Sequence, residues 1–137
     1  MWYTNIGDKM KVLTIKNPWA TLIIDGFKKY EFRSWKTKYR GKILIHSSIN
    51  PDKIALKNFD NLNLDYQNGY IIGEAEIVDC KEVHKEFEDK LVKENKQVYE
   101  MIVGRNGYAW KLENIIKYDN PIPIKGKLGL WEYKKTD

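Results

Sequence analysis

The chain has 137 residues, and 24 lysines and arginines against 19 aspartates and glutamates give it a formal net charge of +5. This length suits one domain, and 42% hydrophobic with 31% charged residues excludes disordered and collagen-like chains. The apolar runs fall far short of the roughly 20 residues that a membrane-spanning helix needs, and the first ten residues lack the apolar stretch of a secretion signal. We therefore expect a cytoplasmic protein without membrane contact. One cysteine and two histidines predict no internal disulfide and no structural zinc site. We expect no cofactor.

The first half of the chain predicts short strands around one short helix. Asn17-Pro18 is a typical helix start, because asparagine caps a helix and proline fits its first turn, and Gly26 is a typical helix stop. After Lys29 the apolar period changes to two, which indicates a strand. In chain order we expect a strand over 11–15, a helix over 18–25, strands over 29–33 and 42–47, and a weak helix over 50–59.

The second half predicts longer elements between turns. Asn68-Gly69 and Asn106-Gly107 are turn signals, and the apolar spacing of residues 84–102 is that of one long helix. We expect strands over 70–79 and 108–112, extended chain to Pro123, and a last strand over 127–133. Five or six short strands with two or three helices predict an α+β domain, built on a small mixed sheet curled toward a barrel.

Positive charge is concentrated between residues 27 and 42, where Glu31 is the one acid among seven basic residues. Positive charge concentrated in this way produces an electrostatic field that attracts polyanions. Two of the three arginines of the chain lie here, and a guanidinium binds phosphate or a base edge through two hydrogen bonds. The alternative is that the lysines only keep the surface soluble. The basic residues are Lys28, Lys29, Arg33, Lys36, Lys38, Arg40 and Lys42.

The sharpest local pattern is Gly26-Phe-Lys28-Lys-Tyr-Glu31-Phe-Arg33, where a helix stop meets a strand. Residues two apart on a strand share a face, so Glu31 and Arg33 project together and Lys28 can fold toward them. Such a trio can recognise a base and a phosphate, or can tune the lysine for acid–base work. The alternative is a surface ion pair without a function.

Three tryptophans are candidates for stacking on a base. Trp19 and Trp35 flank the basic segment, and Trp110 follows the second turn signal. A base that stacks on an exposed aromatic ring is held whatever its sequence context. The alternative is that these side chains are core anchors, which is the commoner use of tryptophan in a small domain.

Two further polar groups invite a chemical interpretation. His46 and Ser47 are adjacent on an expected strand, so they point to opposite faces and His46 is expected to be structural. Glu74 and Glu76 share a strand face and can hold a divalent ion, but a solvated acidic face is the interpretation that we favour.

These motifs together resemble the ASCH domain family, a branch of the PUA-like fold. The resemblance runs from about Lys11 to Trp131, so residues 11–134 are interpreted as a single domain and residues 1–10 as an N-terminal extension. It is carried by Gly-x-Lys-x-x-Glu-x-Arg at 26–33, the helix start Asn17-Pro-Trp-Ala20, the strand Tyr39-Arg-Gly-Lys-Ile-Leu-Ile-His46, Gly73-Glu-Ala-Glu-Ile-Val-Asp-Cys80, Tyr108-Ala-Trp110 and Pro121–Trp131.

The resemblance implies a PUA-like β-barrel with flanking helices and a cleft beside residues 26–33. PUA-like relatives commonly bind RNA, some of them through one modified base. One ASCH branch hydrolyses N4-acetylated cytidine with Lys, Thr and Glu. Lys28 matches that lysine, Glu31 stands at the threonine position, and the glutamate corresponds to Glu74, Glu76 or a glutamate of the long helix.

We therefore expect binding of RNA, single-stranded nucleic acid or a modified nucleoside. The expected binding residues are Trp19, Gly26, Lys28, Glu31, Arg33, Trp35, Lys38, Arg40 and Trp110. The first alternative is a small hydrolase, either an amidohydrolase on modified nucleosides or a ribonuclease, with Lys28 as base or nucleophile and Glu31 orienting it. The second is a protein-interaction module that uses the acidic long helix.

Overall fold

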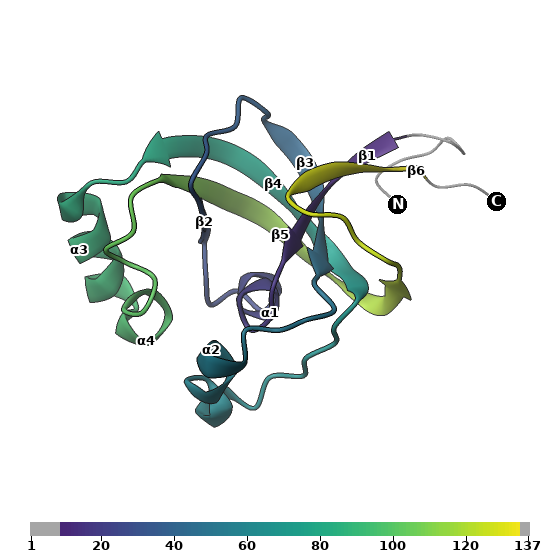
Figure 1. The fold of residues 1–137 in the computed structure, drawn as a ribbon, viewed down its shortest axis with the longest axis horizontal. Coiled ribbons are helices and arrows are strands. Elements are labelled where there is room, and N and C mark those ends of the chain that lie inside the picture. The colour runs from purple at the N-terminus through teal and green to yellow at the C-terminus, as the bar shows by residue number, and fades with distance from the viewer. Residues whose placement is uncertain (1–8, 135–137) are drawn as a thin grey trace.

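The computed structural model describes residues 9–134, so residues 1–8 of the expected N-terminal extension lie outside the described part of the chain. One six-stranded sheet has the order β2-β5-β4-β3-β1-β6 (Figure 1). The strands are β1 (Lys9–Ile15), β2 (Tyr30–Arg33), β3 (Gly41–Ser47), β4 (Tyr70–Glu82), β5 (Tyr108–Pro123) and β6 (Leu130–Lys134). The helices are α1 (Trp19–Ile24), α2 (Lys53–Lys57), η1 (Asp60–Leu62), α3 (Lys85–Glu94) and α4 (Lys96–Tyr99).

The sheet is mixed and curved, which confirms the predicted α+β class. β1 pairs with β3 in parallel, and every other pair of neighbouring strands is antiparallel. The long strands β4 and β5 bend across the molecule (Figure 1). β2 and β6 are the two edges, and within residues 9–134 no ladder joins them. The barrel-like sheet therefore keeps an open seam between β2 on one side and β1 with β6 on the other.

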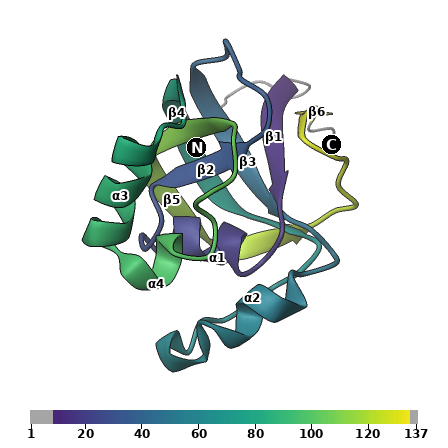
Figure 2. The same cartoon turned by 60° about the vertical axis from the view of Figure 1, so that its left-hand side comes forward.

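Helix α1 lies under the sheet and forms the main core with it (Figure 2). The expected cap is displaced by one residue, because Pro18 and not Asn17 occupies the N-cap position and the helix begins at Trp19. Asn17 Oδ1 still accepts hydrogen bonds from the backbone N–H of Thr21 at 3.0 Å and from its hydroxyl at 2.6 Å, so it satisfies a free N–H of the first turn. Gly26 has φ +88° just after the helix, a backbone geometry that favours glycine, and it turns the chain toward Lys28. The buried residues of α1 are Ala20, Thr21, Leu22, Ile23 and Ile24.

The predicted long helix over 84–102 is wrong in one respect, because it is broken into α3 and α4 at Asn95. Asn95 is extended, with φ −153° and ψ 89°, and its side chain accepts a hydrogen bond from the N–H of Val98 at 3.2 Å. Asparagine competes with the helical backbone in this way and starts α4 as its cap. The apolar residues of both helices still reach one core, which includes Leu91, Val98 and Ile102.

This second core also fixes the start of β2. Figure 2 shows α3 and α4 beside the end of the sheet where β2 lies. The Tyr99 hydroxyl accepts a hydrogen bond from the N–H of Lys29 at 2.9 Å, and the ring of Phe32 packs edge-on against that of Tyr99. The strand that carries Glu31 and Arg33 is therefore held by the Tyr99 contacts of α4 and by its pairing with β5. Within residues 9–134 no helix is both long and apolar enough to cross a membrane.

Candidate nucleic-acid interface

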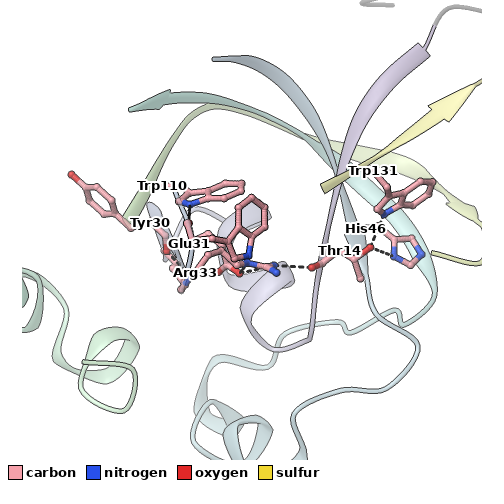
Figure 3. A network of polar contacts seen from close by, with 9 residues as sticks. Thr14, Tyr30, Glu31, Arg33, His46, Trp110 and Trp131 are labelled. Carbon is pink, nitrogen blue, oxygen red and sulfur yellow. Dashed lines mark hydrogen bonds and ion pairs between the residues drawn. The ribbon is translucent and has the colours of Figure 1, made fainter. Parts of the chain in front are cut away.

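The side chains of Lys28, Glu31 and Arg33 converge at the open seam of the sheet. Lys28 Nζ lies 2.8 Å from Glu31 Oε1 and also donates to the carbonyl of Tyr30. Arg33 donates to Glu31 Oε2 from Nε at 3.1 Å and from Nη2 at 2.9 Å (Figure 3). Its Nη2 also donates to the carbonyl of Thr14 on β1 at 2.8 Å. Arg33 thus joins the edge strand β2 to β1 across the seam, and Glu31 holds two cations at once.

Burial makes this group electrostatically distinctive. Lys28 is 2% and Glu31 7% exposed. Burial lowers the pKa of Lys28 below its usual 10.5, even though the neighbouring carboxylate of Glu31 favours the ammonium. Burial alone would raise the pKa of Glu31, but Lys28 and Arg33 outweigh it, and the pKa of Glu31 lies below its usual 4.5. The three side chains form a fixed, charged wall that needs little rearrangement to meet a ligand.

A cavity of about 500 Å³ lies against this wall. This volume is within the roughly 300–1,000 Å³ typical of small-ligand sites. Lys28, Glu31 and Arg33 line one side, and the rings of Trp19 and Phe32 line it beside them. Lys28 Nζ stands 5.8 Å from the centroid of the Trp19 ring and 5.6 Å from that of Phe32, within cation–π distance. The cavity therefore offers flat apolar faces next to hydrogen-bonding charges.

The three expected stacking tryptophans have different positions. Trp19 lines the cavity. Trp35 is 40% exposed and lies beside Gly129, which lines the cavity, so it stands at the rim. Trp110 is completely buried, packs edge-on against Trp35 with ring centroids 4.7 Å apart, and donates from Nε1 to the carbonyl of Trp35 at 3.3 Å. Its ring is closed to a base in this structure and supports Trp35 instead.

Gly26, Lys38 and Arg40 lie outside the residues that line the cavity. Gly26 is exposed at the turn after α1. Lys38 and Arg40 are exposed on the segment between β2 and β3, where Arg40 Nη1 donates to the carbonyls of Thr37 and Tyr39, both at 3.0 Å. A ligand that fills the cavity reaches these cations only if it extends beyond it.

The expected solvated acidic face of β4 is wrong for Glu74, whereas Glu76 is partly exposed. Glu74 is buried, and its Oε2 accepts a hydrogen bond from the Tyr118 hydroxyl at 2.9 Å, while Glu76 accepts one from Asn114 at 2.8 Å. Glu74 lies opposite Leu44 of β3, on the face of the sheet that Tyr118 covers, and sequence periodicity does not reveal this cover. Within residues 9–134 no group of three or more acidic, cysteine or histidine side chains is placed to hold a metal ion.

Several cavity residues escaped the sequence analysis because they come from distant loops. Lys16 follows β1, Arg105 precedes the Asn106-Gly107 turn, and Leu128 precedes β6. Lys16, Arg105 and Leu128 are exposed, and the two cations face the same opening as the Lys28–Glu31–Arg33 group. The one available signal was Arg105 itself, the third arginine of a chain in which lysine supplies nearly all positive charge.

A second polar network adjoins the first through Thr14, as Figure 3 shows. Trp131 Nε1 donates to the Thr14 hydroxyl at 2.9 Å, and this oxygen lies 3.3 Å from His46 Nδ1. His46 Nε2 lies 2.8 Å from the carbonyl of Ile124, which can only accept, so Nε2 carries a proton. The predicted structural role of His46 is confirmed, and Ser47 is bonded separately, to the carbonyl of Tyr70 at 3.1 Å.

Replacing Thr14 with valine is expected to lower the free energy of unfolding by about 1–3 kcal/mol, because Trp131 and His46 would each keep a buried polar group without its partner. Valine has the same shape, so packing changes little. Urea unfolding at neutral pH measures the effect. Thr37→Val serves as the control, since the Thr37 hydroxyl lies on the segment between β2 and β3 and accepts one hydrogen bond, from the N–H of Tyr39 at 3.1 Å. Equal stability of the two variants would show that the network contributes no more than this single bond.

Comparison with known proteins agrees with the fold. Residues 13–122 match the family model described as the ASCH domain. The protein described as activating signal cointegrator 1 is 27% identical over 135 residues in its human form and 26% identical in its mouse form. Each alignment covers 88% of this chain and 22% of the relative, so the chain spans about a fifth of the length of these curated relatives.

A solved structure, described as the crystal structure of ASCH from Zymomonas mobilis, superimposes with a TM-score of 0.53. The match covers 83% of this chain and 73% of that one, at 15% sequence identity. At this identity the similarity concerns the fold.

Proposed function

The chain belongs to the ASCH domain family, and we propose that it binds single-stranded RNA by holding one base in the cavity at the seam of its sheet. One observation carries this proposal: a cavity of about 500 Å³ has the buried Lys28–Glu31–Arg33 group on its wall and the Trp19 ring beside it. Single-stranded RNA is favoured over a duplex because its bases are free to leave the stack and enter a pocket.

Recognition of the base edge would come from Lys28. An ammonium has three N–H donors, and Lys28 uses two of them on Glu31 and the carbonyl of Tyr30. Among the residues that the structure describes, none accepts the third, and the side chain lines the cavity. A base carbonyl is a suitable acceptor for this donor. Glu31 and Arg33 hold Lys28 in place, so the donor is oriented before the ligand arrives.

Recognition of the backbone would come from the exposed cations at the opening, Lys16 and Arg105. Neither has a resolved ion pair within residues 9–134, so both can meet a phosphate without breaking a salt bridge. Asp52 also lines the cavity, but its Oδ1 accepts a hydrogen bond from the N–H of Ala55 at 3.1 Å and caps α2. Lys38 and Arg40 extend the positive field for a longer strand.

The test is a titration of mixed-sequence single-stranded RNA, followed by fluorescence anisotropy at about 50 and 200 mM salt. We expect binding that weakens steeply with salt. Arg105→Ala should reduce the salt slope by about 0.7, the value for one phosphate contact on a single strand. Lys93→Ala removes the same charge from the exposed face of α3 and should leave both affinity and slope unchanged. Absence of binding at low salt would refute the proposal.

Hydrolysis in the same cavity is a second candidate, and the buried position of Lys28 favours it. Burial lowers the pKa of Lys28, so its ammonium loses a proton more easily to give the neutral amine that a base or nucleophile needs. Glu31 opposes this loss. The bound RNA and N4-acetylcytidine should therefore both be analysed for products. Product that forms with the wild type and is absent with Lys28→Met would establish the enzyme, whereas intact ligand with both proteins supports binding alone.

A further inference from the structure

A second cavity of about 490 Å³ lies next to the first, and Thr14, Ser48 and Leu128 line both. We propose that the two cavities receive two neighbouring bases of one RNA strand, and that Leu128 is a wedge that separates them. The ligand is then an oligonucleotide of at least two nucleotides rather than a free nucleoside. This inference rests on the proposed function, because it assumes that the first cavity binds a base.

The segment that carries the wedge is held in place at both ends. Between β5 and β6, the N–H of Ile124 donates to the carbonyl of Gly69 at 3.1 Å, and the carbonyl of Ile124 lies 2.8 Å from His46 Nε2. The carbonyl of Gly129 accepts a hydrogen bond from the N–H of Thr14 at 3.1 Å. We call residues 124–129 the wedge segment. Its anchors fix where the intervening Leu128 stands.

Contact with the protein interior also fixes the middle of the wedge segment. A Cβ atom added to Gly126 would lie 2.2 Å from His46 Cε1, so the backbone of Gly126 rests directly on the histidine ring. His46 is buried and hydrogen-bonded through both ring nitrogens. The floor of the second cavity is therefore rigid. The backbone that carries Leu128 is therefore held in place by the contacts of Ile124, Gly126 and Gly129.

Leu128 itself is 95% exposed, although it lies between two cavities. Ile49, which lines the second cavity from the other side, is 67% exposed. Covering such apolar groups with the flat face of a base removes their area from water and is favourable. Apolar side chains inserted between neighbouring bases are a known device for separating them. Leu128 has the position, exposure and chemistry for this use.

The charge of the second cavity selects a nucleic acid as its occupant. Lys125 and Lys127 line it and are exposed, and its described lining contains no aspartate or glutamate. Lys127 precedes Leu128 directly, at the boundary between the two cavities. The phosphate that joins two nucleotides also lies between their bases, so a strand with one base in each cavity brings this phosphate to the boundary. An apolar peptide would leave both lysines unmatched.

The proposal predicts a step in affinity between one and two nucleotides. Titrations of the full chain with mono-, di-, tri- and tetranucleotides at low salt should show dinucleotides binding about tenfold or more tightly than mononucleotides, as expected for one additional covered base. Further nucleotides should add less. A dinucleotide that contains 2-aminopurine beside a purine should brighten on binding, because this fluorophore is quenched by stacking and the wedge unstacks it.

Two variants test the wedge directly. Leu128→Ser should remove most of the step in affinity between mono- and dinucleotides and the gain in 2-aminopurine fluorescence. Lys127→Ala should reduce the salt slope of dinucleotide binding by about 0.7. Ile54→Ser and Lys93→Ala are the matched controls, because Ile54 on α2 is also an exposed apolar residue and Lys93 is an exposed lysine outside both cavities. Neither control should change the step.

The outcomes separate the inference from the proposed function. Mononucleotides that bind as tightly as dinucleotides, or a step that survives in Leu128→Ser, would overturn the wedge and leave RNA binding intact. An unchanged 2-aminopurine signal with wild type would equally show that the two bases stay stacked. Failure of every nucleotide and oligonucleotide to bind would overturn both the inference and the proposed function.

Discussion

Replacing Glu31 with alanine is expected to lower the free energy of unfolding by about 3–5 kcal/mol, the cost of breaking a buried ion pair from one side. Glu31 is the shared partner of Lys28 and Arg33. Without it, the ammonium of Lys28 stays buried and keeps only the carbonyl of Tyr30 as a hydrogen-bond acceptor. Arg33 is less buried and keeps its bond to the carbonyl of Thr14, so most of the cost falls on Lys28.

Urea unfolding followed by tryptophan fluorescence measures this loss. Glu113→Ala is the matched control, because Glu113 also forms an ion pair, with Lys111 at 3.4 Å, but on the exposed side of β5. Such a surface pair contributes at most about 1 kcal/mol. A Glu31→Ala variant as stable as Glu113→Ala would mean that water reaches Lys28 freely and that the buried, charged wall of the cavity does not exist in solution.

The pH dependence identifies charge as the cause. The pKa of Glu31 in the folded chain lies below its usual 4.5, so its stabilising contribution is complete above that pH and is lost as the pH falls through the folded-state pKa. The difference in stability between wild type and Glu31→Gln should therefore shrink on acidification. Raising the pH should also recover part of the stability of Glu31→Ala, because burial lowers the pKa of Lys28 and the neutral amine is tolerated there.

The local elements around the site were predictable because their signals are local. The helix start at Asn17-Pro18, the stop at Gly26 and the period of two in residues 29–33 each depend on neighbours within a few positions, and α1 and β2 form as these signals predict. The same period placed Glu31 and Arg33 on one face, which the ion pair between them confirms. A family motif that spans one turn and one strand is readable for the same reason.

Contacts between distant segments were not predictable from the sequence. Asn95 breaks a helix that apolar spacing alone presents as continuous, because its side chain competes with the backbone. Glu74 is buried since Tyr118 covers the face of the sheet that Glu74 shares with Leu44. Trp110 is covered because Trp35 packs on it from a different part of the chain. In each case the deciding partner is supplied by tertiary structure, which periodicity does not encode.

The cavity itself is of this second kind. Its charged wall comes from one readable motif, but its opening is formed by Lys16, Arg105 and Leu128, which meet only after β1, β5 and β6 have joined the sheet. The sheet stays open at a seam, and the loops on both sides of this seam line the cavity. A sequence motif can therefore predict the charged Lys28–Glu31–Arg33 group. The shape of the cavity depends instead on the width of the seam between the strands, which the motif does not determine.

That near closure depends on close packing at Gly73, and Gly73→Ala is expected to lower the free energy of unfolding by about 3 kcal/mol, at the upper end for overpacking. A Cβ atom at this position would lie 2.3 Å from the carbonyl oxygen of Ile116 and 2.8 Å from Ile24 Cδ1. The first contact is with the backbone of β5, so it cannot be relieved by a change of rotamer. β4 and β5 would have to separate, in the most extensive pairing of the sheet.

Gly104→Ala distinguishes this lack of space from the general cost of replacing glycine. Gly104 has φ +86°, but a Cβ atom there would have no atom within 4 Å, so the variant should lose only the roughly 1–2 kcal/mol of a left-handed backbone. Equal losses in Gly73→Ala and Gly104→Ala would show that β4 and β5 can move apart at little cost. A larger loss at Gly73 would show that the sheet is tightly packed where it crosses α1. The position of Lys28 depends on that packing, since α1 leads directly into the turn that carries it.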